Sequence, residues 1–352
     1  MKSDYGHEAT DKIIDELEKK IAREYRAAVK DAQEKLNDYM RRFKIKDEKW
    51  RVMVANGEKT AEEYAEWRKG QIIVGKRWEA LRNQLAADMH NANVIARGII
   101  TGEMPTAYAL NMNWATYQLE KLGRVDTGFT LYSRETVERI LRENPDLLPP
   151  PGKNLDAKIA ANKDLRWQEG KIQSIALQSV VQGESIPSMT RRIARELGEI
   201  NHASTIRYAR TAITGAQNAG RQDAYRRAEK LGVDMRRQWI ATLDKRTRHE
   251  HRMLDGQKRG TEEPFEVDGY KIMYPGDPTA APHLVWNCRC TTRALVNGWE
   301  SKSGALRSNK AIDGMSYEDW IKATPEPQRI TKQEKTQEAM RRKTIRELYK
   351  GE

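Results

Sequence analysis

The chain has 352 residues, of which 38% are hydrophobic and 32% charged, and its formal net charge at pH 7 is +12. This apolar fraction lies below the roughly 45–50% of an average globular protein, so we expect much of the chain to form solvated helices. No apolar run is long enough to cross a membrane, and we expect no secretory signal because the N-terminus lacks an apolar stretch. The positive charge permits contact with nucleic acid or an acidic protein, but a solvated helical surface explains it equally well.

The first predicted element is an amphipathic helix from about Glu8 to Lys44. Its apolar residues recur every three or four positions, with charged residues between them and no proline or glycine. So long a helix must pack its apolar stripe on another helix or another chain. A second helix is predicted from about Thr60 towards Ile100, ending at Gly102 and Pro105, before a shorter one from Ala107 to Leu122. We therefore predict an antiparallel helical hairpin or bundle for the N-terminal part.

A domain boundary is predicted at the run Pro149-Pro150-Pro151, because consecutive prolines favour a stiff extended segment. The predicted domains are an N-terminal helical domain over 1–148, a second domain over 153–300 and a basic polar tail over 301–352. The tail is expected to contain one short helix, from Ser316 to Ala323.

The second domain begins with predicted helices over Leu165 to Val181, Pro187 to Gly198 and Ala203 to Leu231. One face of the last helix consists almost entirely of alanine and glycine. Gly215 and Gly220 each cost about 1 kcal/mol against alanine inside a helix, so we expect another backbone to approach closely there.

The hydrophobic period then changes from that of a helix to that of a strand. Strands are predicted over Gln238 to Asp244 and Cys288 to Val296, and a hairpin over Phe265 to Tyr274 turns at Asp268-Gly269. The predicted fold class is mainly α with a smaller α+β part. A long-helix hairpin or bundle comes first, followed by a helical domain with a small antiparallel sheet.

Four short motifs follow one another in the second domain. They are Asp244-Lys245-Arg246-Thr247-Arg248, His251 placed four residues before Asp255-Gly256, Pro275-Gly276-Asp277-Pro278, and Asn287-Cys288-Arg289-Cys290. Together with Ala209-Arg210-Thr211-Ala212 on the preceding predicted helix, their order and spacing resemble the phage Mu F-type minor head protein domain, also called the phage head morphogenesis domain, from about Leu165 to Val296. Tyr108-Ala109-Leu110-Asn111 and Leu147 to Pro151 also resemble the N-terminal half of such proteins from tailed phages of Gram-positive bacteria.

The resemblance implies a minor head protein that is made in the bacterial host cytoplasm and located inside the phage head near the portal. Such proteins bind the portal protein and act in procapsid assembly, DNA packaging or ejection. Scaffold and major capsid protein are further candidate partners, and each head is expected to contain more than one copy. No established enzymatic activity accompanies this domain, and we expect none of the C-terminal toxin or enzyme domains that some relatives carry.

A structural polar lock is the favoured interpretation of the motifs. Arginines would form bidentate bonds to aspartates and hold the loops around the sheet, and turn or cap formation explains the remaining polar residues. The predicted members are Asp244, Arg246, Thr247, Arg248, His251, Asp255, Asp277 and Arg289.

A metal site is the first alternative. Cys288 and Cys290 could bind zinc together with His251 and one of His249, Asp244 or His283, because thiolate and imidazole suit zinc. Against this, the usual spacing has two residues between the cysteines, and both thiols could simply be packed as small apolar groups. No cofactor other than such a structural zinc ion is expected.

Catalysis is the second alternative. Asp244, His251 and Asp255 lie close in sequence and could form the acid/base group of a metal-dependent hydrolase or a nuclease-like effector carried in the virion. An enzyme should bring these groups together in an open pocket, whereas an assembly protein should pair the carboxylates with arginines.

The basic tail is the candidate surface for non-specific contact with packaged DNA, since it lacks the regularly spaced aromatic residues that stack on bases. An exposed mixed-charge helix is an equally good explanation. The candidate residues are Lys332, Lys335, Arg341, Arg342, Lys343 and Arg346.

Overall fold

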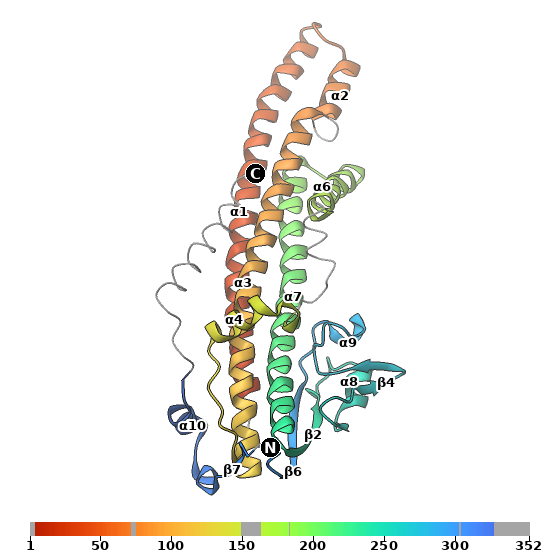
Figure 1. Cartoon of the computed structure of the whole chain (residues 1–352). Helices are drawn as coiled ribbons and strands as arrows, with labels where there is room; N and C mark the ends of the chain where they lie inside the picture. Colours follow the sequence, from red (N-terminus) through yellow and green to blue (C-terminus); the bar gives the residue numbers. More distant parts are fainter. Residues whose placement is uncertain (1–3, 72–74, 149–162, 183, 303, 327–352) are drawn as a thin grey trace.

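The computed structural model describes residues 4–71, 75–148, 163–182, 184–302 and 304–326. Three long helices dominate it: α1 (Tyr5–Ala55), α3 (Lys76–Gly123) and α7 (Ile186–Leu231). They run side by side and give the molecule an elongated shape, with a small sheet at the end where the N-terminus lies (Figure 1). The predicted class, mainly α with a smaller α+β part, is confirmed. No helix in these ranges is both long and apolar enough to cross a membrane.

The apolar stripe of α1 is buried against α3 and α7 of the same chain. Ile14, Leu17, Ile21 and Leu36 are all at least nine-tenths buried. Asp4 caps the helix by accepting a hydrogen bond from the backbone N–H of His7. The predicted amphipathic helix is confirmed, and its partners are other helices of this chain.

Two predicted helix ends are wrong, because α3 continues through Gly102 and Pro105, and α7 continues through Gly198. Both helices are densely packed along these stretches, so tertiary burial offsets the local cost of proline or glycine. Gly198 is a contact point instead of a stop, since a Cβ atom there would overlap the side chain of Val29 on α1.

Shorter helices flank the bundle. α2 (Ala61–Lys69) begins with a capping box between Thr60 and Glu63 and covers the end of α1 that is distant from the sheet (Figure 1). α4 (Arg134–Glu143) and the 3₁₀ turn η2 (Pro145–Leu147) follow α3, and α6 (Lys163–Val181) packs on α3 and α7.

The close approach expected at the small-residue face of α7 is present. A Cβ atom added at Gly220 would overlap the carbonyl oxygen of Tyr108 on α3, and one at Gly215 would lie 2.9 Å from the carbonyl oxygen of Gly276. The two glycines therefore let backbone segments from both sides contact α7.

The main sheet has strand order β3-β2-β6, with β2 (Val233–Ile240) antiparallel to both β3 (Lys258–Arg259) and β6 (Thr291–Trp299). The predicted hairpin is confirmed as β4 (Phe265–Val267) and β5 (Tyr270–Ile272), turning at Asp268 and Gly269. The predicted strand beginning at Cys288 starts only at Thr291, so both cysteines lie in the preceding loop. The strand predicted to reach Asp244 ends at Ile240.

Residues 304–326, the first part of the predicted tail, pack on the helical bundle. β7 (Arg307–Ser308) pairs with β1 (Val125–Asp126), and η3 (Lys310–Gly314) and α10 (Tyr317–Ala323) follow. The indole of Trp320 on α10 donates a hydrogen bond to the buried Glu120 carboxylate at 2.7 Å, and burial raises the pKa of Glu120. One buried core thus includes side chains from all three predicted domains. The proline run lies outside the described residues.

Candidate functional site

The motifs of the second domain meet because of the pairing between β2 and β6. Ile240, the last residue of β2, lies opposite Thr291, the first residue of β6. The loop that leaves β2 therefore runs beside the loop that enters β6. The first loop leads into α8 (His249–Leu254), and the second follows α9 (Pro282–Val285), which brings residues 241–254 next to residues 286–290.

Asp244 and Arg289 form the bidentate pair at the centre of this arrangement. Nη1 and Nη2 of Arg289 donate to the two carboxylate oxygens of Asp244 at 2.6 and 2.7 Å. The backbone N–H of Arg246 and the hydroxyl of Thr247 also donate to Asp244. The bonds from Arg289 hold the pKa of Asp244 well below its ordinary value. However, the side chains of Asp244 and Arg289 are 36% and 27% exposed, so the pair lies at the surface and not in the core.

Among the other predicted members of the lock, Arg246 forms a second ion pair with Asp244 at 3.7 Å, whereas Asp255, Asp277 and Arg248 bind backbone groups. Asp255 accepts a hydrogen bond from the N–H of Ala241 at 2.8 Å. Asp277 accepts from the N–H groups of Met273 and Thr279. Arg248 donates to the carbonyl oxygen of Trp286 and to Nε2 of His251, at 2.7 and 3.0 Å. These residues fix the loops around the sheet through main-chain contacts.

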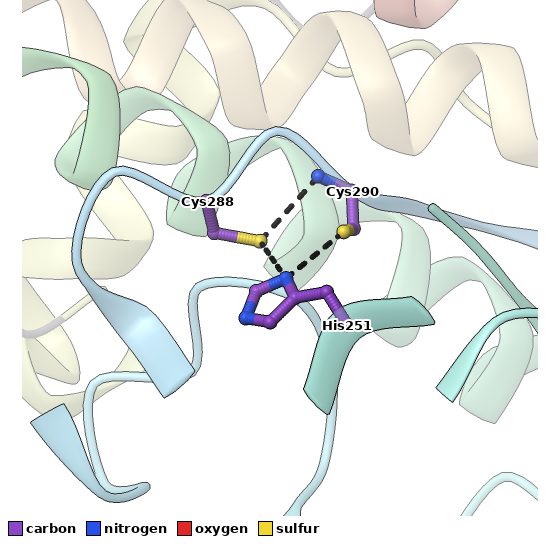
Figure 2. Close-up of side chains that lie close together, drawn as sticks. All are labelled: His251, Cys288 and Cys290. Atoms are coloured by element: carbon purple, nitrogen blue, oxygen red, sulfur yellow. Dashed lines mark hydrogen bonds between the residues drawn. The ribbon is translucent and has the colours of Figure 1, made fainter. Parts of the chain in front are cut away.

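His251, Cys288 and Cys290 converge beside this pair (Figure 2). Nδ1 of His251 lies 3.2 Å from the sulfur of Cys290 and 3.6 Å from that of Cys288. All three side chains are buried, and their ligand atoms lie within 4.8 Å of one another. His249 and His283 are exposed and do not join the cluster.

The pKa values of the two thiols are shifted in opposite directions. Hydrogen bonds from Cys288 and His251 lower the pKa of Cys290 to about 5, although burial opposes this. Burial and the neighbouring Cys290 raise the pKa of Cys288 well above its ordinary value. The site therefore favours one thiolate and one thiol, held together by the histidine ring.

A cavity of about 80 Å³ adjoins the cluster. Four arginines contribute to its lining: Arg210, Arg246, Arg248 and Arg289. Asp244, His251 and Asp255, the predicted catalytic group, each have separate partners, namely Arg289, the two cysteines and the N–H of Ala241. Within the part of the chain that the structure describes, these three groups do not converge on a common open position.

Two polar residues of α7 make contacts with the site that were not predicted, although Thr211 belongs to the segment Ala209-Arg210-Thr211-Ala212. The hydroxyl of Thr211 accepts a hydrogen bond from the N–H of Asn287, and the amide of Asn218 donates to the carbonyl oxygen of Cys290. Both residues interrupt the small-residue face at helical spacing, which is the signal that could have indicated them. The candidate DNA contacts from Lys332 to Arg346 lie outside the described residues.

Comparison with known proteins gives a family match over the part of the chain that contains this site. Residues 170–293, which include α8 and the cysteine loop, match the family described as Phage Mu protein F like protein. This part of the chain is thus similar to phage Mu F-like proteins, and the resemblance to head morphogenesis proteins inferred from the motifs is confirmed.

Two curated relatives are similar over longer stretches. The chain is 24% identical over 321 residues to minor head protein GP7 of Bacillus phage SPP1, covering 89% of this chain and 94% of that protein. It is 27% identical over 205 residues to NAD(+)-arginine ADP-ribosyltransferase EFV of Enterococcus faecalis, covering 58% of this chain. The chain spans only 40% of the length of the enterococcal protein. No solved structure gives a significant match.

Replacing Asp244 by asparagine should lower the melting temperature only slightly, because a half-exposed ion pair contributes little to stability. The carboxylate has a lowered pKa in the folded chain, so its contribution is present above the unfolded pKa of about 3.9 and is lost as the pH falls. The melting temperature should therefore fall less between pH 7 and pH 3 for Asp244→Asn than for the wild type. A large loss at pH 7 would contradict the surface position of the pair.

Proposed function

We propose that this chain is a minor protein of the head of a tailed bacteriophage and is present in the virion. The observation that carries the proposal is the similarity to minor head protein GP7 over 321 residues. An alignment of that length cannot be confined to the Mu F-like segment of residues 170–293, so it includes most of the helical bundle. The similarity to GP7 therefore includes both the helical bundle and the Mu F-like segment.

The proposed action is binding to the portal protein inside the head, during procapsid assembly, DNA packaging or ejection. The apolar stripe of α1 is used within the chain, so it cannot be the portal-binding surface. The end of α1 distant from the sheet does present apolar side chains to solvent, since Ile45 and Val52 are 55% and 54% exposed. We assign the portal contact to this end of the bundle.

A structural role fits the site better than hydrolysis. The carboxylates of Asp244 and Asp255 are engaged by Arg289 and by the N–H of Ala241, and the adjoining cavity of about 80 Å³ is small for a substrate. This supports the proposal that the chain acts as an assembly protein and not as a metal-dependent hydrolase or nuclease.

Procapsids provide the test. Procapsids assembled with the portal protein should contain the chain, and those assembled without it should lack the chain, as measured by mass spectrometry. The double variant Ile45→Lys with Val52→Lys should be lost from portal-containing procapsids, because two charges would enter the apolar contact.

The matched control is Leu243→Lys, since Leu243 is also exposed, at 66%, but lies beside the sheet. This variant should be incorporated normally. Incorporation that does not depend on the portal would contradict portal binding. Loss of Leu243→Lys with retention of the double variant would move the contact to the Mu F-like segment.

A further inference from the structure

We propose that His251, Cys288 and Cys290 bind a divalent ion of the zinc class through Nδ1 and the two sulfur atoms, with water as the fourth ligand. The ligands come from α8 and from the loop before β6, which lie side by side because of the β2–β6 pairing (Figure 2). The inference goes beyond the proposed head function and does not depend on it.

The distances suit such an ion. Zinc binds imidazole nitrogen at about 2.0 Å and thiolate sulfur at about 2.3 Å, which places nitrogen and sulfur about 3.5 Å apart in a tetrahedral site. The observed separations from Nδ1 are 3.2 Å to Cys290 and 3.6 Å to Cys288. The two nitrogen–sulfur separations therefore need to change by at most a few tenths of an ångström, and all three ligand atoms lie within 4.8 Å of one another. Two soft thiolates with one imidazole select zinc over magnesium or calcium, which prefer oxygen.

The surrounding backbone is arranged to hold sulfur as thiolate. The N–H of Cys290 points at the sulfur of Cys288 at 3.4 Å. The cysteine loop is itself fixed to α7 through Thr211 and Asn218. Such outer contacts orient ligands before an ion arrives and raise its affinity.

The charge of the site also balances. Two thiolates neutralise a divalent ion, and the proton of the remaining thiol passes to solvent when the ion binds. Because the charges of the ion and the two thiolates cancel, the bound ion adds no unpaired positive charge beside the arginines that line the cavity. The fourth ligand faces the cavity of about 80 Å³, which has room for water because one molecule needs only about 10–15 Å³ of such space.

Binding requires one rearrangement, at Arg248. Its guanidinium donates to Nε2 of His251, so the neutral ring carries its proton on Nδ1, facing the sulfurs. When an ion occupies Nδ1, that proton shifts to Nε2 and the guanidinium must turn away from the ring. Arg248 can keep its bond to the carbonyl oxygen of Trp286, so the loop stays attached.

The test uses the full chain, purified under reducing conditions, stripped with a chelator and dialysed against Zn²⁺. Atomic emission should find one zinc ion per wild-type chain. Cys288→Ser and His251→Gln should bind zinc at least about 100-fold more weakly. Loss of an outer-shell contact alone lowers metal affinity by up to about 100-fold, and these variants lose a direct ligand. The matched control is His249→Gln, because His249 lies on the same helix but is exposed. This control should retain the zinc ion.

Titration of the folded wild type with Co²⁺ gives a second measurement that does not depend on the variants folding. A sulfur-to-cobalt charge-transfer band should appear and should saturate at one ion per chain. Removing the ion with a chelator should lower the melting temperature. The proposal is overturned if the folded wild type binds no zinc and gives no thiolate band with cobalt. It is also overturned if Cys288→Ser and His251→Gln fold and bind zinc as tightly as the wild type.

Discussion

Replacing Asp4 by asparagine should destabilise the chain by about 3 kcal/mol at pH 7. Asp4 accepts two hydrogen bonds of 2.7 Å from the guanidinium of Arg221, whose side chain is completely buried. Breaking a buried ion pair costs roughly 3–5 kcal/mol, because the remaining charge has no counterpart. We expect the lower end, since Arg221 keeps its bonds to the side chain of Asn111 and the carbonyl oxygen of Thr292. Asparagine also caps helices well, so the start of α1 should be preserved.

The same pair should give the stability a pH dependence of known sign. Burial alone would raise the pKa of Asp4, but the hydrogen bonds and charge of Arg221 outweigh it and lower the pKa. A carboxylate with a lowered folded pKa stabilises the chain above its unfolded pKa, about 3.9, and loses that contribution as the pH falls. The difference between wild type and Asp4→Asn should therefore be largest at pH 7 and shrink below about pH 4.

Urea unfolding of the full chain at several pH values measures this effect. Asp15→Asn is the matched control, since Asp15 lies on the same helix and is exposed. It should change the free energy of unfolding by less than about 0.5 kcal/mol. Equal losses for the two variants would mean that the buried guanidinium does not depend on Asp4.

Local patterns predicted the elements whose determinants are local. The stripe of α1 and the Asp268-Gly269 hairpin follow from periodicity and turn chemistry, and both are present. The ends predicted at Pro105 and Gly198 are wrong because a single proline or glycine costs less than the burial that continuous α3 and α7 achieve. The residues around a proline or glycine do not indicate whether segments distant in the sequence will bury that part of the helix.

In the site, too, the residue types predicted some features, whereas features set by distant segments were not predicted. Residue types alone indicated that Asp244 would pair with an arginine, and the partner is Arg289. Its partial exposure could not be inferred, because exposure depends on how the two loops pack. The pair between Asp4 and Arg221 had no sequence signal, since 217 positions separate its members. The convergence of His251 with the cysteines follows from the β2–β6 register, whereas the sequence predicted only that each of the two segments forms a strand.

The small-residue face of α7 is the long-range feature that the sequence did predict, and it leads to a second large effect. Gly220→Ala would place a Cβ atom against the carbonyl oxygen of Tyr108 and 3.2 Å from the N–H nitrogen of Met112, both on the α3 backbone. Backbone cannot rotate away as a flexible side chain can, so α3 and α7 would have to separate.

Two contributions of opposite sign decide the outcome at Gly220. Alanine favours a helix over glycine by about 1 kcal/mol, whereas overpacking of a tight contact typically costs about 1–3 kcal/mol and occasionally more. Because the overlap here involves backbone, we expect a net loss of about 2 kcal/mol in urea unfolding. Gly98→Ala on α3 is the matched control: no atom lies within 4 Å of its added Cβ, so it should stabilise by up to about 1 kcal/mol. Stabilisation by both variants would show that the two helices do not approach as closely as the structure has them.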